Sequence, residues 1–215
     1  MKPITEIKIG IFGNYWLMYG VPIEPTFCTR IASFDVGLKH MSVCVIDFYD
    51  NDFHIRKWFL ISMKGKNISE FTNETIEKLR LQHFGCIDYV LIEQQINRNT
   101  QMKVISHVIQ AYFQCELKIP TPRVIFVSPK KRVDSTSAEY SAIVSQVKEQ
   151  LGLENTYSRR DYKNISILIA NHFLQCEHLS YWKNFFTEQT KKDDYADSLV
   201  QAIAWKCSYS INDPD

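Results

Sequence analysis

Hydrophobic and polar residues alternate along three successive stretches in the first third of the chain, and this spacing is typical of β-strands. The stretches cover residues 30–37, 41–48 and 53–61. The polar run Tyr49-Asp50-Asn51-Asp52 between the last two has the composition of a hairpin turn. Short connections join antiparallel strands, so we expect these three strands to form an antiparallel meander.

Two short apolar runs follow, at residues 86–93 and 123–127, and each is typical of a buried parallel strand. Apolar residues recur with helical spacing at 67–83, 100–114, 136–151, 160–175 and 191–207. Residues 179–190 are expected to form a loop. Three antiparallel strands followed by crossover-linked strands predict an α/β protein with a mixed five-stranded sheet flanked by helices. This is the layout of the ribonuclease H-like fold.

The first 29 residues fit this pattern poorly. Their apolar run is interrupted by Glu6, Lys8 and Asn14, and Pro22 and Pro25 mark a break before the first strand. We expect residues 1–29 to be an extension, with a possible short strand or hairpin, and residues 30–208 to form one domain. A secretory signal is not expected, and no apolar run is long enough to span a bilayer.

Charge and cysteine usage narrow the functional classes. The formal net charge is +1, so any nucleic-acid surface has to be a local basic patch. The six cysteines are scattered without a CxxC pair, which favours reduced, mostly buried thiols in an intracellular protein. His172, Cys176 and His178 are of metal-ligating types, but a fourth ligand at a usual spacing is missing, so a zinc site is not expected among them.

Four acids are spaced so that the predicted fold brings them together. Asp35 ends the first main strand, and Glu93 ends the strand expected beside it. Asp194 and Asp197 are three residues apart and share a helix face, whereas Asp193 is off that spacing. Converging carboxylates repel one another unless cations hold them, and hard oxygen ligands suit Mg²⁺ or Mn²⁺. Two such ions can activate a water for phosphodiester hydrolysis.

Each acid also has an ordinary structural explanation. Asp35 could close a turn, Glu93 could be a surface charge, and Asp194 could stabilise a helix N-terminus. The presence of all four at one predicted sheet edge favours the metal site.

Five segments carry a resemblance to a known family. S-F-D-V-G-L-K, L-I-E-Q-Q, F-V-S-P, R-R-D-Y-K and D-D-Y-A-D-S occur in this order within residues 30–207. They resemble the poxvirus Holliday junction resolvases, relatives of bacterial RuvC and of the fungal mitochondrial resolvases. The resemblance implies a homodimeric, metal-dependent endonuclease that cuts four-way DNA junctions symmetrically during recombination and resolves replication intermediates. It also implies two Mg²⁺ or Mn²⁺ ions per active site, no nucleotide cofactor, and a large DNA virus that replicates in the host cytoplasm.

The same resemblance assigns roles residue by residue. It implies that Lys163 is a catalytic cation near the scissile phosphate or the attacking water, although a lysine there could also be a solvated helix-face residue. Gln94 and His40 depart from the family, where arginine and asparagine are common, but neither change removes a ligand. The catalytic metal ligands implied are Asp35, Glu93, Asp194 and Asp197.

Basic residues cluster near the predicted catalytic edge and could track DNA phosphates. Recognition of a junction would depend on its shape, so little sequence readout is expected. Two symmetric cuts require two sites and hence a twofold dimer, for which the helix at 100–114 is the predicted interface. The candidate DNA-binding residues are Lys39, Arg98, Lys103, Lys130, Lys131, Arg132, Arg159 and Arg160.

Two alternatives remain open, and a third is disfavoured. A nuclease of the same fold could act on flaps or RNA–DNA hybrids with the same metal chemistry. A non-catalytic DNA-binding module could keep vestigial acids, although the presence of all four argues against it. A sugar-kinase or actin-like ATPase would need a longer chain and a second phosphate loop, and the seven glycines form no Gly-rich candidate.

Overall fold

The structure is a computed structural model, and its first two strands form a small sheet of their own. β1 (Ile9–Phe12) pairs antiparallel with β2 (Tyr15–Met18), so the extension does contain a hairpin. The domain boundary at residue 30 stays a prediction. The structure describes residues 9–12, 15–18, 28–49, 52–95, 99–134, 136–153 and 158–209, without the side chains of the hairpin or of Arg159.

The main sheet has five strands in the order β5-β4-β3-β6-β7. β4 is antiparallel to both of its neighbours, β3 and β5, whereas β6 runs parallel to β3 and β7 runs parallel to β6. The predicted mixed sheet of the ribonuclease H-like fold is therefore confirmed. The strands are β3 (Thr29–Asp35), β4 (His40–Phe48), β5 (Phe53–Ser62), β6 (Tyr89–Glu93) and β7 (Val124–Val127).

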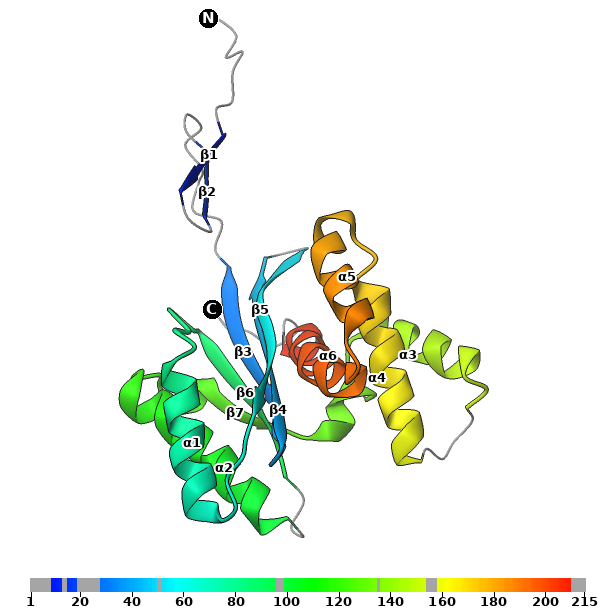
Figure 1. Cartoon of the computed structure of the whole chain (residues 1–215). Coiled ribbons are helices and arrows are strands. Elements are labelled where there is room, and N and C mark those ends of the chain that lie inside the picture. Colours follow the sequence, from blue (N-terminus) through cyan, green and yellow to red (C-terminus); the bar gives the residue numbers. More distant parts are fainter. Residues whose placement is uncertain are drawn as a thin grey trace, which may run out of the picture.

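Helices cover both faces of this sheet (Figure 1). Alternation along β3 sends Ala32 and Phe34 into the core under α1 and α2, and sends Ile31 into the core under α3, α4 and α6. The α-helices are α1 (Ile68–Arg80), α2 (Thr100–Ala111), α3 (Ala138–Gln150), α4 (Arg159–Phe173), α5 (Ser180–Glu188) and α6 (Lys192–Tyr209). A π-helical turn, Tyr112–Glu116, extends α2, and 3₁₀ turns cover Thr121–Arg123, Pro129–Arg132 and Glu177–Leu179.

The expected loop at residues 179–190 is wrong, because α5 occupies most of it. Aromatic packing holds this short helix on the sheet: the rings of Trp58 and Phe186 stack with centroids 5.1 Å apart. The indole N–H of Trp182 donates to the carbonyl of Ile55 at 2.9 Å. Such contacts with a distant strand add to the helical spacing of the apolar residues Trp182, Phe185 and Phe186 in stabilising this short helix.

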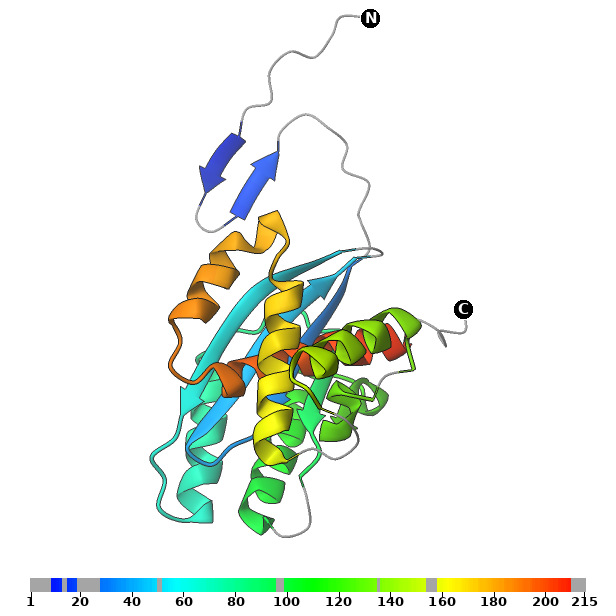
Figure 2. The same ribbon diagram turned by 90° about the vertical axis from the view of Figure 1, so that its right-hand side faces the viewer.

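α6 is buried on nearly every side, although its sequence predicts a single apolar face. It lies between the sheet and α4 (Figure 2), so polar residues on its other faces also lose solvent. Ser198 shares a hydrogen bond of 2.7 Å with Ser42. Gln201 Nε2 donates to Ser33 Oγ at 3.1 Å and to the Phe34 carbonyl at 3.2 Å. These buried bonds fix α6 across β3 and β4, directly beside Asp35.

All six cysteines lie within the described residues and carry free thiols. The expectation that they are mostly buried is wrong for Cys86, Cys115 and Cys176, which are exposed. Among the described helices, none combines the length and apolar character needed to cross a membrane.

Candidate active site

Three parallel strands bring acidic and basic side chains to one edge of the sheet. Phe34 pairs with Ile92, so Asp35 and Glu93 occupy the next position on neighbouring strands. Glu93 in turn pairs with Val127 of β7. The 3₁₀ turn that follows β7 ends at Arg132 and returns this side chain over the same edge. The adjacency predicted for Asp35 and Glu93 is therefore what the strand register produces.

The Arg132 guanidinium lies among three carboxylates. Its Nη1 is 2.9 Å from Asp197 Oδ2 and 3.9 Å from Asp35 Oδ1, and its Nη2 is 3.4 Å from Glu93 Oε2. The Nη1 contacts are ion pairs without hydrogen-bond geometry, so this buried donor is incompletely satisfied. The Tyr140 hydroxyl donates to the Arg132 carbonyl at 2.7 Å and so fixes the backbone of Arg132.

One guanidinium does not neutralise this cluster. Burial, reinforced by Glu93, raises the pKa of Asp35 well above its usual range. Burial also raises the pKa of Asp197 to about 7, although Arg132 acts against it. Carboxylates with raised pKa values favour protonation or an added positive charge. The edge is thus a site of surplus negative charge in a region largely closed to water.

Asp194 lies at the border of this cluster. Burial and the neighbouring Asp193 raise its pKa, and its charge is among those that raise the pKa of Asp35. Asp193 instead forms an ion pair with Lys163 of α4. Although burial acts in the opposite direction, this ammonium holds the pKa of Asp193 below its usual range. The structure therefore places Lys163 at the rim of the acid cluster, in contact with Asp193, the acid that does not share a helix face with Asp197.

The predicted DNA-binding residues fall into two groups. Lys39, Lys130, Lys131 and Arg160 are exposed, whereas Arg132 is inside the acid cluster. Lys103 is half-buried and lines a pocket of about 270 Å³ that also includes Gln94 and Phe126. Arg98 and the side chain of Arg159 lie outside the described residues.

A groove of about 380 Å³ adjoins the acid edge. Arg160 and Lys163 from α4 line one part of it, and Lys192 and Asp193 from the start of α6 line another. The basic side chains of this groove are the right chemistry for a phosphate backbone that approaches the acids from the α4 side.

Sequence reasoning named Arg132 only as a DNA-binding residue and did not name Gln201. Because Arg132 follows Lys130 and Lys131, the sequence suggests a surface residue. The 3₁₀ turn after β7 instead directs its side chain to the acids. Gln201 anchors α6 beside Asp35. The sequence feature that could have identified it is a glutamine among the otherwise apolar residues of the helix interior.

Comparisons with known proteins identify relatives in sequence and in fold. No protein-family model matches the chain. The mitochondrial cruciform cutting endonuclease 1 of Schizosaccharomyces pombe is 24% identical over 212 residues, which cover 86% of this chain and 79% of that protein.

Two solved structures share the fold. The fowlpox virus Holliday junction resolvase matches with a TM-score of 0.56 and 19% identity, over 86% of this chain and all (100%) of that one. The fowlpox virus resolvase in complex with its substrate Holliday junction DNA matches with a TM-score of 0.58 and 18% identity, at the same coverage of 86% and 100%. The resemblance to a fungal mitochondrial endonuclease is thus confirmed in sequence, and the resemblance to a poxvirus resolvase is confirmed in fold.

Proposed function

We propose that this chain is a metal-dependent endonuclease that resolves four-way DNA junctions by symmetric phosphodiester hydrolysis. The observation that carries the proposal is the convergence of Asp35, Glu93 and Asp197 on one buried cation, Arg132, at the edge of a resolvase-like sheet. The names of the similar proteins, a cruciform cutting endonuclease and a Holliday junction resolvase, support the substrate class.

The residues at this edge fit divalent metal ions. The donor set consists of carboxylate oxygens only, which suits Mg²⁺ or Mn²⁺ better than softer ions. The position of the Arg132 guanidinium supports the fit, because the carboxylates already converge on a positive charge. When bound, a pair of such ions supplies a Lewis acid and lowers the pKa of a water. The residues that would hold them are Asp35, Glu93, Asp194 and Asp197.

Two cations of the chain have separate roles in this proposal. Arg132 limits repulsion among the acids in the resting protein, and its guanidinium is free to turn to a phosphate oxygen when other cations satisfy the carboxylates. Lys163 is held at the rim by Asp193, where its ammonium can offset charge that develops on the scissile phosphate. Both residues orient the DNA strand and stabilise negative charge.

The exposed basic residues would guide the junction to the acids. Lys39 projects from the turn after β3, Lys130 and Lys131 come from the turn after β7, and Arg160 lies along the α4 groove. Contacts of this kind bind phosphates without reading bases. Roles for Lys103, Arg98 and Arg159 in DNA binding remain part of the prediction.

Symmetric cleavage implies a twofold dimer that presents two acid edges to one junction. The predicted interface includes α2, where the side chain of Val104 is 38% exposed. A viral source and a site of action in the host cytoplasm stay predictions from the resemblance.

The test is a substrate panel. Purified protein is incubated with a synthetic four-way junction, a flap, a linear duplex and an RNA–DNA hybrid, with and without Mg²⁺, beside the Asp35→Asn variant. We expect paired, symmetric nicks in the junction only, dependent on Mg²⁺ and absent in the variant. Preferential cleavage of the flap or hybrid would identify a different nuclease of this fold, and junction binding without cleavage would identify a non-catalytic module.

A further inference from the structure

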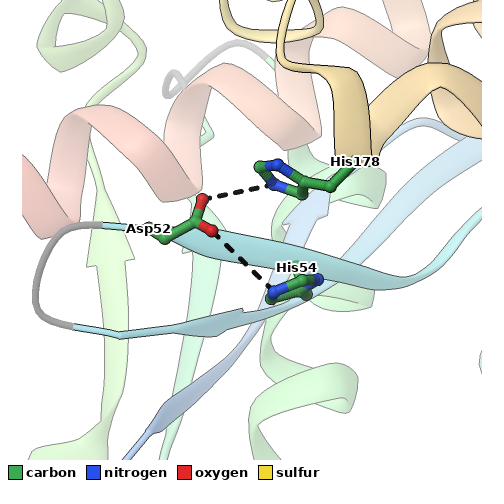
Figure 3. A group of neighbouring side chains, drawn as sticks. All are labelled: Asp52, His54 and His178. Atoms are coloured by element: carbon green, nitrogen blue, oxygen red, sulfur yellow. Dashed lines mark ion pairs between the residues drawn. The ribbon is translucent and has the colours of Figure 1, made fainter. Parts of the chain in front are cut away.

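A second group of potential metal ligands lies at the opposite end of the central sheet. Asp52 and His54 belong to the β4–β5 hairpin, and His178 belongs to the 3₁₀ turn that leads into α5 (Figure 3). Phe48 pairs with Thr29 at the start of β3, whereas Asp35 ends that strand. Six strand residues at about 3.3 Å each separate the two ends by roughly 20 Å.

Both imidazoles direct their Nε2 atoms toward the Asp52 carboxylate (Figure 3). His178 Nε2 is 3.2 Å from Asp52 Oδ1, and His54 Nε2 is 3.9 Å from Asp52 Oδ2. The ligand atoms of the three residues all lie within 4.8 Å of one another. Bonds of about 2.0–2.1 Å in a tetrahedral zinc site place ligand atoms about 3.3 Å apart. The observed separations approach that value without any ion.

The surroundings orient the carboxylate and also contact both imidazoles. The backbone N–H of Phe53 donates to Asp52 Oδ1 at 2.7 Å and orients the acid. The His54 and His178 rings lie 5.0 Å apart between centroids. Their side chains are 47% and 34% exposed, so an ion can enter from solvent. A bound ion would replace the contact of 3.1 Å between His178 Nε2 and the Phe53 carbonyl.

The ligand chemistry differs from that of the acid edge. Two imidazole nitrogens and one carboxylate suit Zn²⁺, whereas Mg²⁺ and Mn²⁺ prefer sets made of oxygen. We propose that Asp52, His54 and His178 form a zinc site, completed by water, that clamps the β4–β5 hairpin to the segment before α5. The neighbours His172 and Cys176, which the sequence grouped with His178, are not part of this cluster.

The role assigned to this site is structural. It ties residues more than a hundred positions apart in sequence, and α5 otherwise rests on aromatic contacts with β5. A ligand that binds only the folded state stabilises it by an amount that grows with the logarithm of the ligand concentration relative to Kd, so zinc should raise the melting temperature. The inference does not depend on the proposed nuclease activity.

Zinc titration of the metal-stripped, full-length protein tests the site. We expect one saturable Zn²⁺ equivalent by calorimetry, a higher melting temperature, and visible absorption of tetrahedral type when Co²⁺ is used instead. The double variant His54→Ala/His178→Ala should lose more than about tenfold in Zn²⁺ affinity and should lose the Co²⁺ absorption. His172→Ala, which removes an exposed histidine of α4, is the matched control and should bind like the wild type.

Zinc bound at the acid edge is distinguished by Asp35→Asn, which should keep both the Zn²⁺ equivalent and its thermal shift. The proposal is overturned if the double variant binds Zn²⁺ as tightly as the wild type. It is also overturned if the wild type shows no saturable binding. In that case the cluster is only a hydrogen-bonded clasp, consistent with the 3.1 Å between His178 Nε2 and the Phe53 carbonyl.

Discussion

Two buried acidic sites lie at opposite ends of the central strands and differ in how many cations each acid meets. Asp47 of β4 has no exposed side-chain surface, and Arg30 and Arg56 form ion pairs with it. Arg30 Nη2 donates to its Oδ2 at 2.8 Å, and Arg56 Nε donates to the same oxygen at 2.6 Å. At the other end, three carboxylates share the single guanidinium of Arg132.

The pKa values diverge accordingly. Although burial alone acts upwards, Arg30 and Arg56 hold the pKa of Asp47 below its usual range. Burial raises the pKa of Asp197 to about 7 and that of Asp35 well above its usual value. A fully paired buried acid is costly to disrupt, because its partners are left without their anion, whereas a cluster short of positive charge costs stability and gains from a bound cation. The comparison separates an acid whose charge is compensated by two cations from acids whose charge is not.

The largest effect is expected when the under-paired cluster loses an acid. Asp35→Asn should reduce junction cleavage to below about a thousandth of the wild-type rate while junction binding persists. The melting temperature of the metal-free protein should hold or rise, because a poorly compensated charge is gone. Single-turnover cleavage, a binding titration and thermal melting measure these quantities. Retained cleavage would remove Asp35 from the ligand set.

Asp47→Asn should have the opposite profile. The substitution leaves Arg30 and Arg56 without their anion and should lower the free energy of unfolding by about 3 kcal/mol, at the low end for a broken buried pair because both arginines are partly exposed. Urea denaturation measures this loss. Cleavage per folded molecule should equal that of the wild type, and a specific loss of activity would contradict a purely structural role.

Lys163 tests whether a cation at the rim serves the reaction or the fold. Lys163→Ala should slow cleavage about a hundredfold with little change in Mn²⁺ binding or melting temperature, because its partner Asp193 is only partly buried. Asp193→Asn is the matched control: it releases the ammonium without deleting it and should slow cleavage less. Equal rates for Lys163→Ala and the wild type would move this role to another residue.

The smallest effect is expected in the pH dependence of stability without metal. The lowered pKa of Asp47 gives stability that is present above the ordinary aspartate pKa and is lost as pH falls through the folded-state value. The raised pKa of Asp197 works in the other direction: folding loses stability as pH rises from the ordinary value, near 4, to about 7. Melting temperatures measured from pH 3 to pH 8 should therefore fall less between pH 4 and pH 7 in Asp197→Asn than in the wild type. In Asp47→Asn they should fall less as the pH drops below the ordinary aspartate pKa. The same pH dependence of the melting temperature in both variants would contradict the opposite pKa shifts of Asp47 and Asp197.

The sheet and part of the site follow from local sequence rules. Strand alternation and crossover connections place Asp35 beside Glu93, and the spacing of three residues puts Asp194 and Asp197 on one helix face. Arg132 could not be assigned in this way, because its direction depends on how the turn after β7 packs on Tyr140.

Contacts between distant segments account for the remaining misses. The apolar residues of α5 do have helical spacing, but the position of the helix depends on Trp58 of β5, which lies far away in the sequence. The Asp52, His54 and His178 cluster joins a hairpin to a turn far along the chain, so ligand spacing in the sequence gives no signal. Residues that act through tertiary neighbours are the ones that sequence patterns leave out.

The most direct measurement is anomalous diffraction from a crystal of this protein soaked in Mn²⁺. We predict manganese bounded by the carboxylates of Asp35 and Asp197, with the Arg132 guanidinium displaced from Asp197. A crystal with no manganese among these oxygens, and with Arg132 still paired to Asp197 and Glu93, would contradict the assignment of this edge as a metal-dependent catalytic centre.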